Sequence, residues 1–146
     1  MLEIEQKVVA NIENDSGIDT LLNPSEADNR IYTFYPHRDV EYNSTNRSAI
    51  FYFSRMPKRN YKWSYPYQMP NIFFYFRVLS INPLELRQIS EKLINLFDNT
   101  SLQTDNWSVK WIEIKSYTDG ESEGGPSNVK LVKNLSFDFT NVFKRG

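Results

Sequence analysis

The feature that most constrains the fold is a nine-residue run, 71–79, that is apolar at almost every position. It reads Asn-Ile-Phe-Phe-Tyr-Phe-Arg-Val-Leu. Successive side chains of a β-strand point to opposite faces, so a strand that is apolar at both odd and even positions must be covered on two sides. We therefore predict a central strand over 71–79, with further strands beside it and a packed layer above it.

A helix signal follows this predicted strand directly. In Asn82-Pro83-Leu84-Glu85, a capping side chain precedes a proline at the first helical position, and a glutamate stands three residues after the cap. Apolar residues then recur every three or four positions as far as Phe97, where Asp98-Asn99-Thr100 ends the pattern. We predict a helix here, packed on the sheet.

The remaining patterns predict one more helix and four more strands. An apolar stripe predicts a helix over 2–13, followed by one further helical turn at 18–22. Runs rich in aromatic and β-branched residues predict strands at 31–35, 49–54, 107–117 and 129–142. The element order α-β-β-β-α-β-β predicts a single α+β domain over 1–146, with an antiparallel or mixed sheet of about five strands packed by two helices.

Two of the predicted strands have patterns that make finer predictions. In 107–117 the apolar positions change from odd to even numbers, which predicts a bulge or coverage of both faces near Trp111. In 129–142, Leu135, Phe137 and Phe139 alternate with polar residues. This alternation predicts that one face of the strand is wet and carries Ser136, Asp138 and Thr140.

Composition argues against several classes of function. The 146-residue chain has no cysteine and a single histidine, His37, which leaves no thiol chemistry and no histidine-cluster metal site. We find neither a glycine loop that cradles phosphate nor a Gly-x-Ser-x-Gly elbow. We therefore predict no catalytic residues, no cofactor, no metal and no enzymatic activity.

No run approaches the ~20 apolar residues of a membrane span, and the N-terminus does not resemble a secretory signal, so we expect no membrane partner and synthesis in a cytoplasm.

The segment 55–70 has the most unusual composition in the chain. It holds three prolines, four basic residues and no acid, and therefore predicts a long extended loop. Cations interleaved with aromatic rings are typical of platforms that stack single-stranded nucleic acid, and also of protein-contact loops. A third interpretation is a hairpin whose rings pack on their own sheet. Its candidate interface residues are Arg55, Lys58, Arg59, Tyr61, Lys62, Trp63, Tyr65 and Tyr67.

A second loop, 118–127, is predicted to be mobile and acidic. It contains three of the five glycines, and its acids Asp119, Glu121 and Glu123 are the other interface candidates. The charges also divide along the chain. Residues 1–29 hold seven acids against one lysine, whereas residues 30–77 hold eight basic residues against two acids. A subunit with such opposed zones can pair with its own copies in a heterologous ring contact.

The order of these elements resembles that of the tail terminator (tail completion, tail-to-head joining) proteins of long-tailed bacteriophages. The resemblance is carried by the N-terminal helix, the strand opening at Arg30-Ile31-Tyr32, the strand Ala49-Ile50-Phe51-Tyr52, the strand-helix unit from Phe73 to Phe97 and a Phe-Asp-Phe final strand. The long 55–70 loop departs from that pattern.

This resemblance implies a structural virion protein, assembled in the host cytoplasm, that forms a six-membered ring. It implies as partners the tail tube protein, the head-tail connector or stopper protein, and DNA that passes through the lumen without specific binding. The ring would cap the tube, stop its polymerisation and join tail to head. Two alternatives stay open: a head-completion or stopper protein of the neck, and a single-stranded nucleic-acid-binding module that uses loop 55–70.

Overall fold

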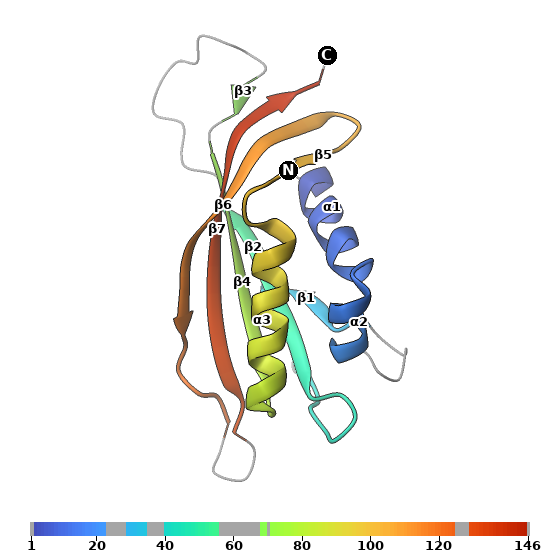
Figure 1. The fold of residues 1–146 in the computed structure, drawn as a ribbon, viewed down its shortest axis with the longest axis vertical. Helices are drawn as coiled ribbons and strands as arrows, with labels where there is room; N and C mark the ends of the chain where they lie inside the picture. The colour runs from blue at the N-terminus through green and yellow to red at the C-terminus, as the bar shows by residue number, and fades with distance from the viewer. Residues whose placement is uncertain are drawn as a thin grey trace.

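In the computed structural model of the chain, three helices lie on one side of a mixed β-sheet (Figure 1). The structure describes residues 2–22, 29–34, 40–55, 68–69, 71–124 and 129–145. The elements in chain order are α1 (Leu2–Glu13), α2 (Ser16–Leu22), β1 (Ile31–Thr33), β2 (Ser48–Arg55), β3 (Gln68–Met69), β4 (Ile72–Ser80), α3 (Pro83–Phe97), β5 (Thr100–Gln103), β6 (Trp107–Asp119) and β7 (Leu131–Lys144).

The sheet confirms the predicted α+β class and the predicted central strand. Its strand order is β1-β2-β4-β7-β6-β5, and β3 also pairs with β7. Only the β1–β2 pair is parallel, and β4 is antiparallel to both of its neighbours, β2 and β7. The prediction of five strands was too low, because β3 and β5 have two and four residues and are too short to show a periodicity.

The short strand β3 and the long strand β4 follow β7 in one common register. Gln68 pairs with Phe143 and Ile72 pairs with Phe139, so no residue is inserted between the two pairings. Position 70 between them is a proline, which has no amide hydrogen for a ladder. The predicted loop 55–70 was therefore too long: Arg55 belongs to β2 and Gln68–Met69 to β3. Residues 56–67 and 70 lie outside the described residues.

Phenylalanine rings fill the space between α3 and the sheet. Phe76 of β4 lies 5.8 Å from Phe97 of α3 and 5.7 Å from Phe137 of β7, measured between ring centroids. Phe74 lies 5.3 Å from Phe139 in the same layer. All five rings are buried, and burying each contributes roughly 1.5–3 kcal/mol to folding. The apolar stripes of α1 and α2, Ile4, Val8, Ile12, Ile18 and Leu22, extend this core.

The predicted irregularity near Trp111 is present. Leu102 of β5 pairs with Val109 of β6 and Thr100 pairs with Ile112, so β6 has one extra residue in the interval that contains Trp111. A second register shift, against β7, falls between Ile114 and Ser116 and was not predicted. The prediction of a wet face on the last strand was wrong at Asp138, which is buried.

The start of α3 confirms the predicted cap but corrects the role of its glutamate. The Asn82 side-chain oxygen accepts hydrogen bonds from the amides of Leu84 (3.0 Å) and Glu85 (3.1 Å). The Glu85 carboxylate does not accept the hydrogen bond from the Asn82 backbone amide that a capping box would make. It accepts a hydrogen bond from Arg47 (Nε, 3.0 Å), and the Ser48 hydroxyl lies 3.0 Å from its second oxygen.

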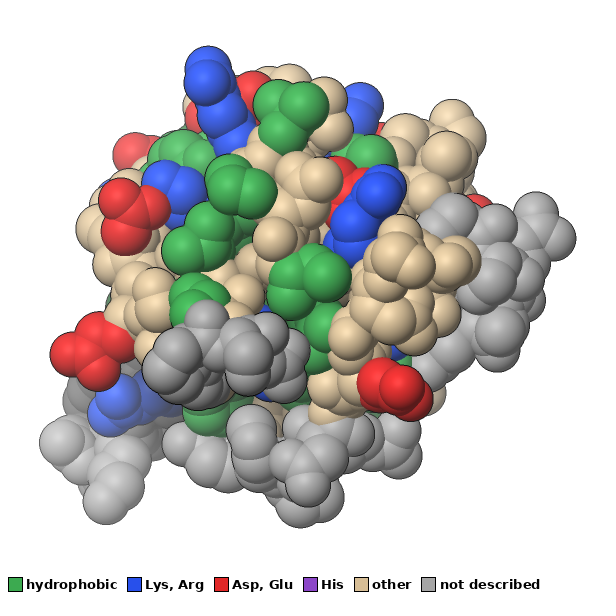
Figure 2. Space-filling model, turned by 90° about the horizontal axis from the view of Figure 1, so that it is seen from below, with side chains coloured by type: hydrophobic (Ala, Val, Ile, Leu, Met, Phe, Trp, Pro, Cys, Tyr) green, Lys and Arg blue, Asp and Glu red, His purple; other side chains and the backbone are tan. Residues whose placement is uncertain are grey.

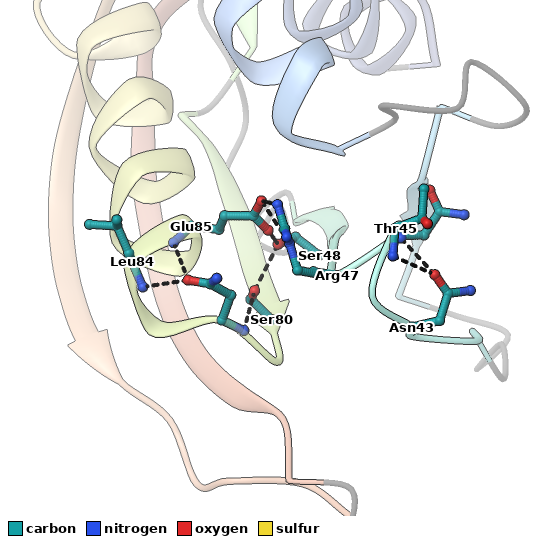
Figure 3. A network of polar contacts seen from close by, with 9 residues as sticks. Asn43, Thr45, Arg47, Ser48, Ser80, Leu84 and Glu85 are labelled. Carbon is teal, nitrogen blue, oxygen red and sulfur yellow. Dashed lines mark hydrogen bonds and ion pairs between the residues drawn. The ribbon is translucent and has the colours of Figure 1, made fainter.

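Two serines complete this polar network between β2, β4 and α3. Ser48 and Ser80 are buried, and their hydroxyl oxygens are 2.7 Å apart (Figure 3). Ser80 also accepts a hydrogen bond from the Asn82 amide at 3.0 Å. Every buried hydroxyl in the network therefore has a partner, as buried polar groups require.

We predict that Glu85→Ala destabilises the chain by about 1–3 kcal/mol, because it removes the carboxylate that accepts hydrogen bonds from the buried Ser48 hydroxyl and from Arg47. Glu91→Ala is the matched control. It removes another glutamate of α3 that is also paired with an arginine, Arg87, but this pair is exposed, so the expected loss is below about 0.5 kcal/mol. Urea unfolding of the three proteins measures the difference, and equal losses in both variants would contradict a structural role for the Glu85 network.

Candidate protein-interaction surface

The structure describes four of the eleven predicted interface residues. Arg55 is exposed at the end of β2, and Asp119, Glu121 and Glu123 follow one another at the end of β6 and beyond it. His37 and the remaining candidates, Lys58, Arg59, Tyr61, Lys62, Trp63, Tyr65 and Tyr67, lie outside the described residues. The predicted aromatic and basic site in the 55–70 loop therefore stays a prediction.

Two of the three acids in the predicted loop 118–127 pair with cations of the same chain. Asp119 forms an ion pair with Lys133 of β7, and its carboxylate raises the pKa of the Lys133 ammonium. Glu123 Oε1 lies 2.7 Å from Arg77 Nη2. Glu121 is exposed and has no ion pair within the described part of the chain.

The backbone of this segment is also more regular than predicted. Strand β6 continues to Asp119, two residues into the predicted loop. The Gly120 amide then donates to the Val132 carbonyl at 2.9 Å, and the Glu123 and Lys130 backbones exchange two hydrogen bonds. Gly120 therefore lies within a paired stretch of β6 and β7 that continues to the Glu123–Lys130 bridge.

The sheet face opposite the helices carries aromatic and polar side chains, and we call it the outer face. Phe53 of β2 stacks on Tyr75 of β4 with 4.6 Å between the ring centroids. Tyr32 and Phe51 lie 5.5 Å apart toward the β1 side. None of the three helices covers these rings, and part of the outer face forms a second, smaller apolar cluster around Phe51.

A groove of about 290 Å³ crosses the outer face, and we call it the outer-face groove. Aromatic side chains from β2 and β4 lie on one side of it, and hydroxyl and amide side chains from β6 and β7 lie on the other. The Ser116 and Ser136 hydroxyl oxygens there are 2.6 Å apart. The principal lining residues are Phe53, Tyr75, Arg77, Ser116, Asn134 and Ser136.

Asp138 is a buried acid on the outer face beside this groove. It pairs across the strands with Glu113, and Lys115 Nζ lies 3.6 Å from Glu113 Oε1 and 4.0 Å from Asp138 Oδ2. The other Asp138 oxygen is buried without a hydrogen bond. Burial raises the pKa of Asp138, and the Lys115 charge opposes that rise only in part. The alternating sequence pattern gave no signal that would distinguish Asp138 from its solvated neighbours.

A second groove, of about 610 Å³, lies at the end of the molecule where α3 begins. Hydrophobic side chains gather at this end and alternate with charged ones (Figure 2). Among the described residues, Leu84, Tyr117 and Val129 are exposed apolar residues of this end of the molecule. Lys133 Nζ lies 5.0 Å from the Tyr117 ring centroid. Exposed apolar surface of this kind is typical of a contact site.

The two edges of the sheet keep unpaired backbone groups among the described residues. Strand β5 covers β6 only as far as Ile112, and Asp98 Oδ1 then accepts the Ile114 amide at 2.9 Å. Because Gly120 donates inward to β7, the alternation of an antiparallel ladder turns the backbones of Tyr117 and Asp119 outward. We call residues 113–119 the β6 edge.

The opposite edge is formed by β1, residues 31–33, and we call it the β1 edge. The Arg30 carbonyl accepts a hydrogen bond from the Ile50 amide, and the Phe34 amide donates one to the Tyr52 carbonyl. Both groups therefore point toward β2. The alternation between them turns the backbone of Thr33 away from β2. Each described end of the sheet thus exposes a short stretch of strand.

The described residues hold no cluster of three or more histidine, cysteine, aspartate or glutamate side chains that could bind a metal ion. None of their helices is long and apolar enough to cross a membrane.

Comparison with known proteins assigns the chain to no family. No family model matches the chain, and no curated protein matches it. One solved structure, whose name states no function, aligns with 94% of this chain and 90% of its own, with 10% sequence identity and a TM-score of 0.49. A likeness at this level carries no argument about function.

We predict that Asp138→Asn stabilises the chain at neutral pH. The folded state raises the pKa of Asp138, so the native acid binds its proton more tightly than the unfolded one. The contribution of Asp138 to stability is therefore greatest at acidic pH and falls as the pH rises through the folded pKa. The advantage of the variant should accordingly be largest at pH 7 and shrink toward pH 3.

Thermal unfolding between pH 3 and 7 measures this advantage. Asp105→Asn makes the same change of net charge in an exposed turn and serves as the control. An Asp138→Asn variant that is less stable than the wild type at pH 7 would contradict the argument from burial.

Proposed function

We propose that this chain is a structural subunit of a bacteriophage virion that forms a ring, caps the tail tube, stops its polymerisation and joins the tail to the head connector. One observation carries the proposal: as far as the described residues show, the sheet has an open β1 edge at one end and an open β6 edge at the other. The resemblance of the element order to tail terminator proteins supplies the biological context.

Two different open edges on one sheet favour a head-to-tail assembly. Pairing between the β6 edge of one copy and the β1 edge of the next leaves each terminal copy with one unpaired edge until the ring closes. Main-chain hydrogen bonds then supply affinity, as in other strand additions. The bulge between Ile114 and Ser116 restricts such pairing to the outer end of β6, around Tyr117 and Asp119.

The charges of the described residues are compatible with this arrangement. Residues 2–22 carry five acids and one lysine, whereas residues 129–145 carry four basic residues and one acid. Opposed zones of this kind steer copies together. Exposed Glu121 is available to face a neighbour or a DNA-filled lumen, where negative charge would keep DNA from binding.

Native mass spectrometry and negative-stain electron microscopy of the purified chain, alone and with tail tube protein, test the proposal. Rings of defined stoichiometry on the tube ends are the expected result. Loss of the protein from an infected cell should produce overlong tails or unjoined heads. A monodisperse monomer at high concentration that forms no ring with tube protein would overturn the proposal.

We predict that Tyr117→Pro abolishes ring assembly and leaves the fold intact. The Tyr117 amide points away from β7, so a proline removes a donor only from the open edge. Tyr117→Val removes the same aromatic side chain but keeps the backbone amide, so this variant should still assemble into rings. Electron microscopy scores the rings and circular dichroism the fold. Rings formed by a folded Tyr117→Pro variant would show that the β6 edge is not the contact.

A titration with fluorescent single-stranded oligonucleotides tests the nucleic-acid alternative. The ring proposal predicts little affinity for these oligonucleotides. Salt-sensitive binding that is lost in Trp63→Ala would instead favour a nucleic-acid-binding module that uses the 55–70 loop.

A further inference from the structure

We propose that two copies of this chain associate through their outer faces, with Trp111 of each copy inserted into the outer-face groove of the other. The inference concerns the face of the sheet and does not depend on the ring proposal, which concerns its edges. A protrusion and a hollow on one face are the requirement for a two-fold contact, in which the same surface serves both partners.

Trp111 is the protrusion. It is 43% exposed, although a tryptophan side chain is costly to leave in water. Its neighbour Ile112 is buried on the helix side, so the strand alternation places the Trp111 side chain on the outer face. Its indole N–H makes no hydrogen bond to any residue that the structure describes. Tryptophan is also among the residues most enriched at the energetic centres of protein interfaces.

The outer-face groove offers the two kinds of contact that an indole needs. The Tyr75 ring on one side provides an aromatic surface for stacking. Asn134 and the Ser116–Ser136 hydroxyl pair on the other side provide oxygen acceptors for the indole N–H. Among the described residues, the Asn134 side-chain amide has no hydrogen-bond partner, so we expect it to be available to the second copy.

The spacing of the two features suits a face-to-face pair. Trp111 and Ser116 lie on the same strand five residues apart, which is about 16 Å at ~3.3 Å per residue. A two-fold axis that passes midway between them, in the plane of the interface, brings each Trp111 over the groove of the other copy. Two sheets that pack in this way lie about 10 Å apart, a distance that inward-pointing side chains fill.

The charge of the outer face also suits a two-fold contact. Near the axis each copy contributes Glu113 and Lys115, one charge of each sign, so two outer faces meet without excess charge of one sign. Val40 and Tyr42 pack on the cluster around Phe51, Leu79 and Val132, so the part of the outer face left for a partner is the part that carries the groove and Trp111.

Analytical ultracentrifugation from about 1 to 100 μM tests the inference with two point variants. The wild type should dimerise in this range, and Trp111→Ala should weaken self-association at least 30-fold, as expected for the central residue of an interface. Leu84→Ala is the matched control, because it truncates a 63% exposed side chain at the start of α3, away from the outer face. It should dimerise like the wild type.

A cross-linking experiment tests the contact itself and uses the absence of cysteine from the chain. Thr140→Cys, which pairs across the strands with Trp111, is mixed with Ser136→Cys in the presence of a short bismaleimide. Heterodimeric cross-links are expected from this mixture, but not from Leu84→Cys mixed with Ser136→Cys.

A wild type that is monomeric at 100 μM, or a Trp111→Ala variant that dimerises as strongly as the wild type, would overturn the inference. Loss of rings with retention of the two-fold pair is the result expected of Tyr117→Pro. A wild type that forms the two-fold pair but no rings with tail tube protein would count against the ring proposal only. Loss of the pair in Trp111→Ala with retention of rings would show that the two contacts are separate.

Discussion

The rest of the structure depends on the requirement that β4 be covered on both faces. Its even-numbered residues, Ile72, Phe74 and Phe76, are buried under the helices, and this layer joins β4 to β7 and α3 through contacts between phenylalanine rings. Its odd-numbered residues lie on the outer face, where no helix covers them. There Phe73 and Tyr75 are only half-buried. The helix layer thus covers one face of β4. On the other face, the second apolar cluster covers Leu79, and the region around Phe73 and Tyr75 is where we propose that a second copy packs.

Long periodic segments of the chain predict their structures correctly, for a physical reason. The stripe of α1, the cap at Asn82 and the apolar run of β4 are local patterns that agree with the contacts the fold makes. The α+β class follows from these elements and their order. Strands β3 and β5 are absent from the prediction because they form through pairing with β7 and β6, and pairing partners do not appear in a local pattern.

The candidate site is less accessible to sequence reasoning because its properties arise from neighbours across the sheet. Asp138 occupies a polar position in a well-alternating strand, and this position predicts exposure to solvent. In the structure it is instead buried, beside Glu113 and Lys115 of the neighbouring strand. Glu85 satisfies a capping pattern, yet Arg47 and Ser48, which lie more than thirty residues away in sequence, bind its carboxylate. The sequence makes Asp119 and Glu123 interface candidates, whereas the structure pairs them with Lys133 and Arg77 of the same chain.

The contacts of α1 differ from those of the other helices and have a consequence for the order of folding. Glu3 at its start accepts hydrogen bonds from the backbone amide and side chain of Asn106, both at 2.9 Å, across 103 residues of sequence. By contrast, β2, β4 and α3 are bound to one another by the Glu85 network over fewer than forty residues. Closing a short loop costs less chain entropy than closing a long one, so we expect β2, β4 and α3 to form the folding nucleus. The N-terminal helix then docks last, and in a native-state hydrogen-exchange experiment it should open first.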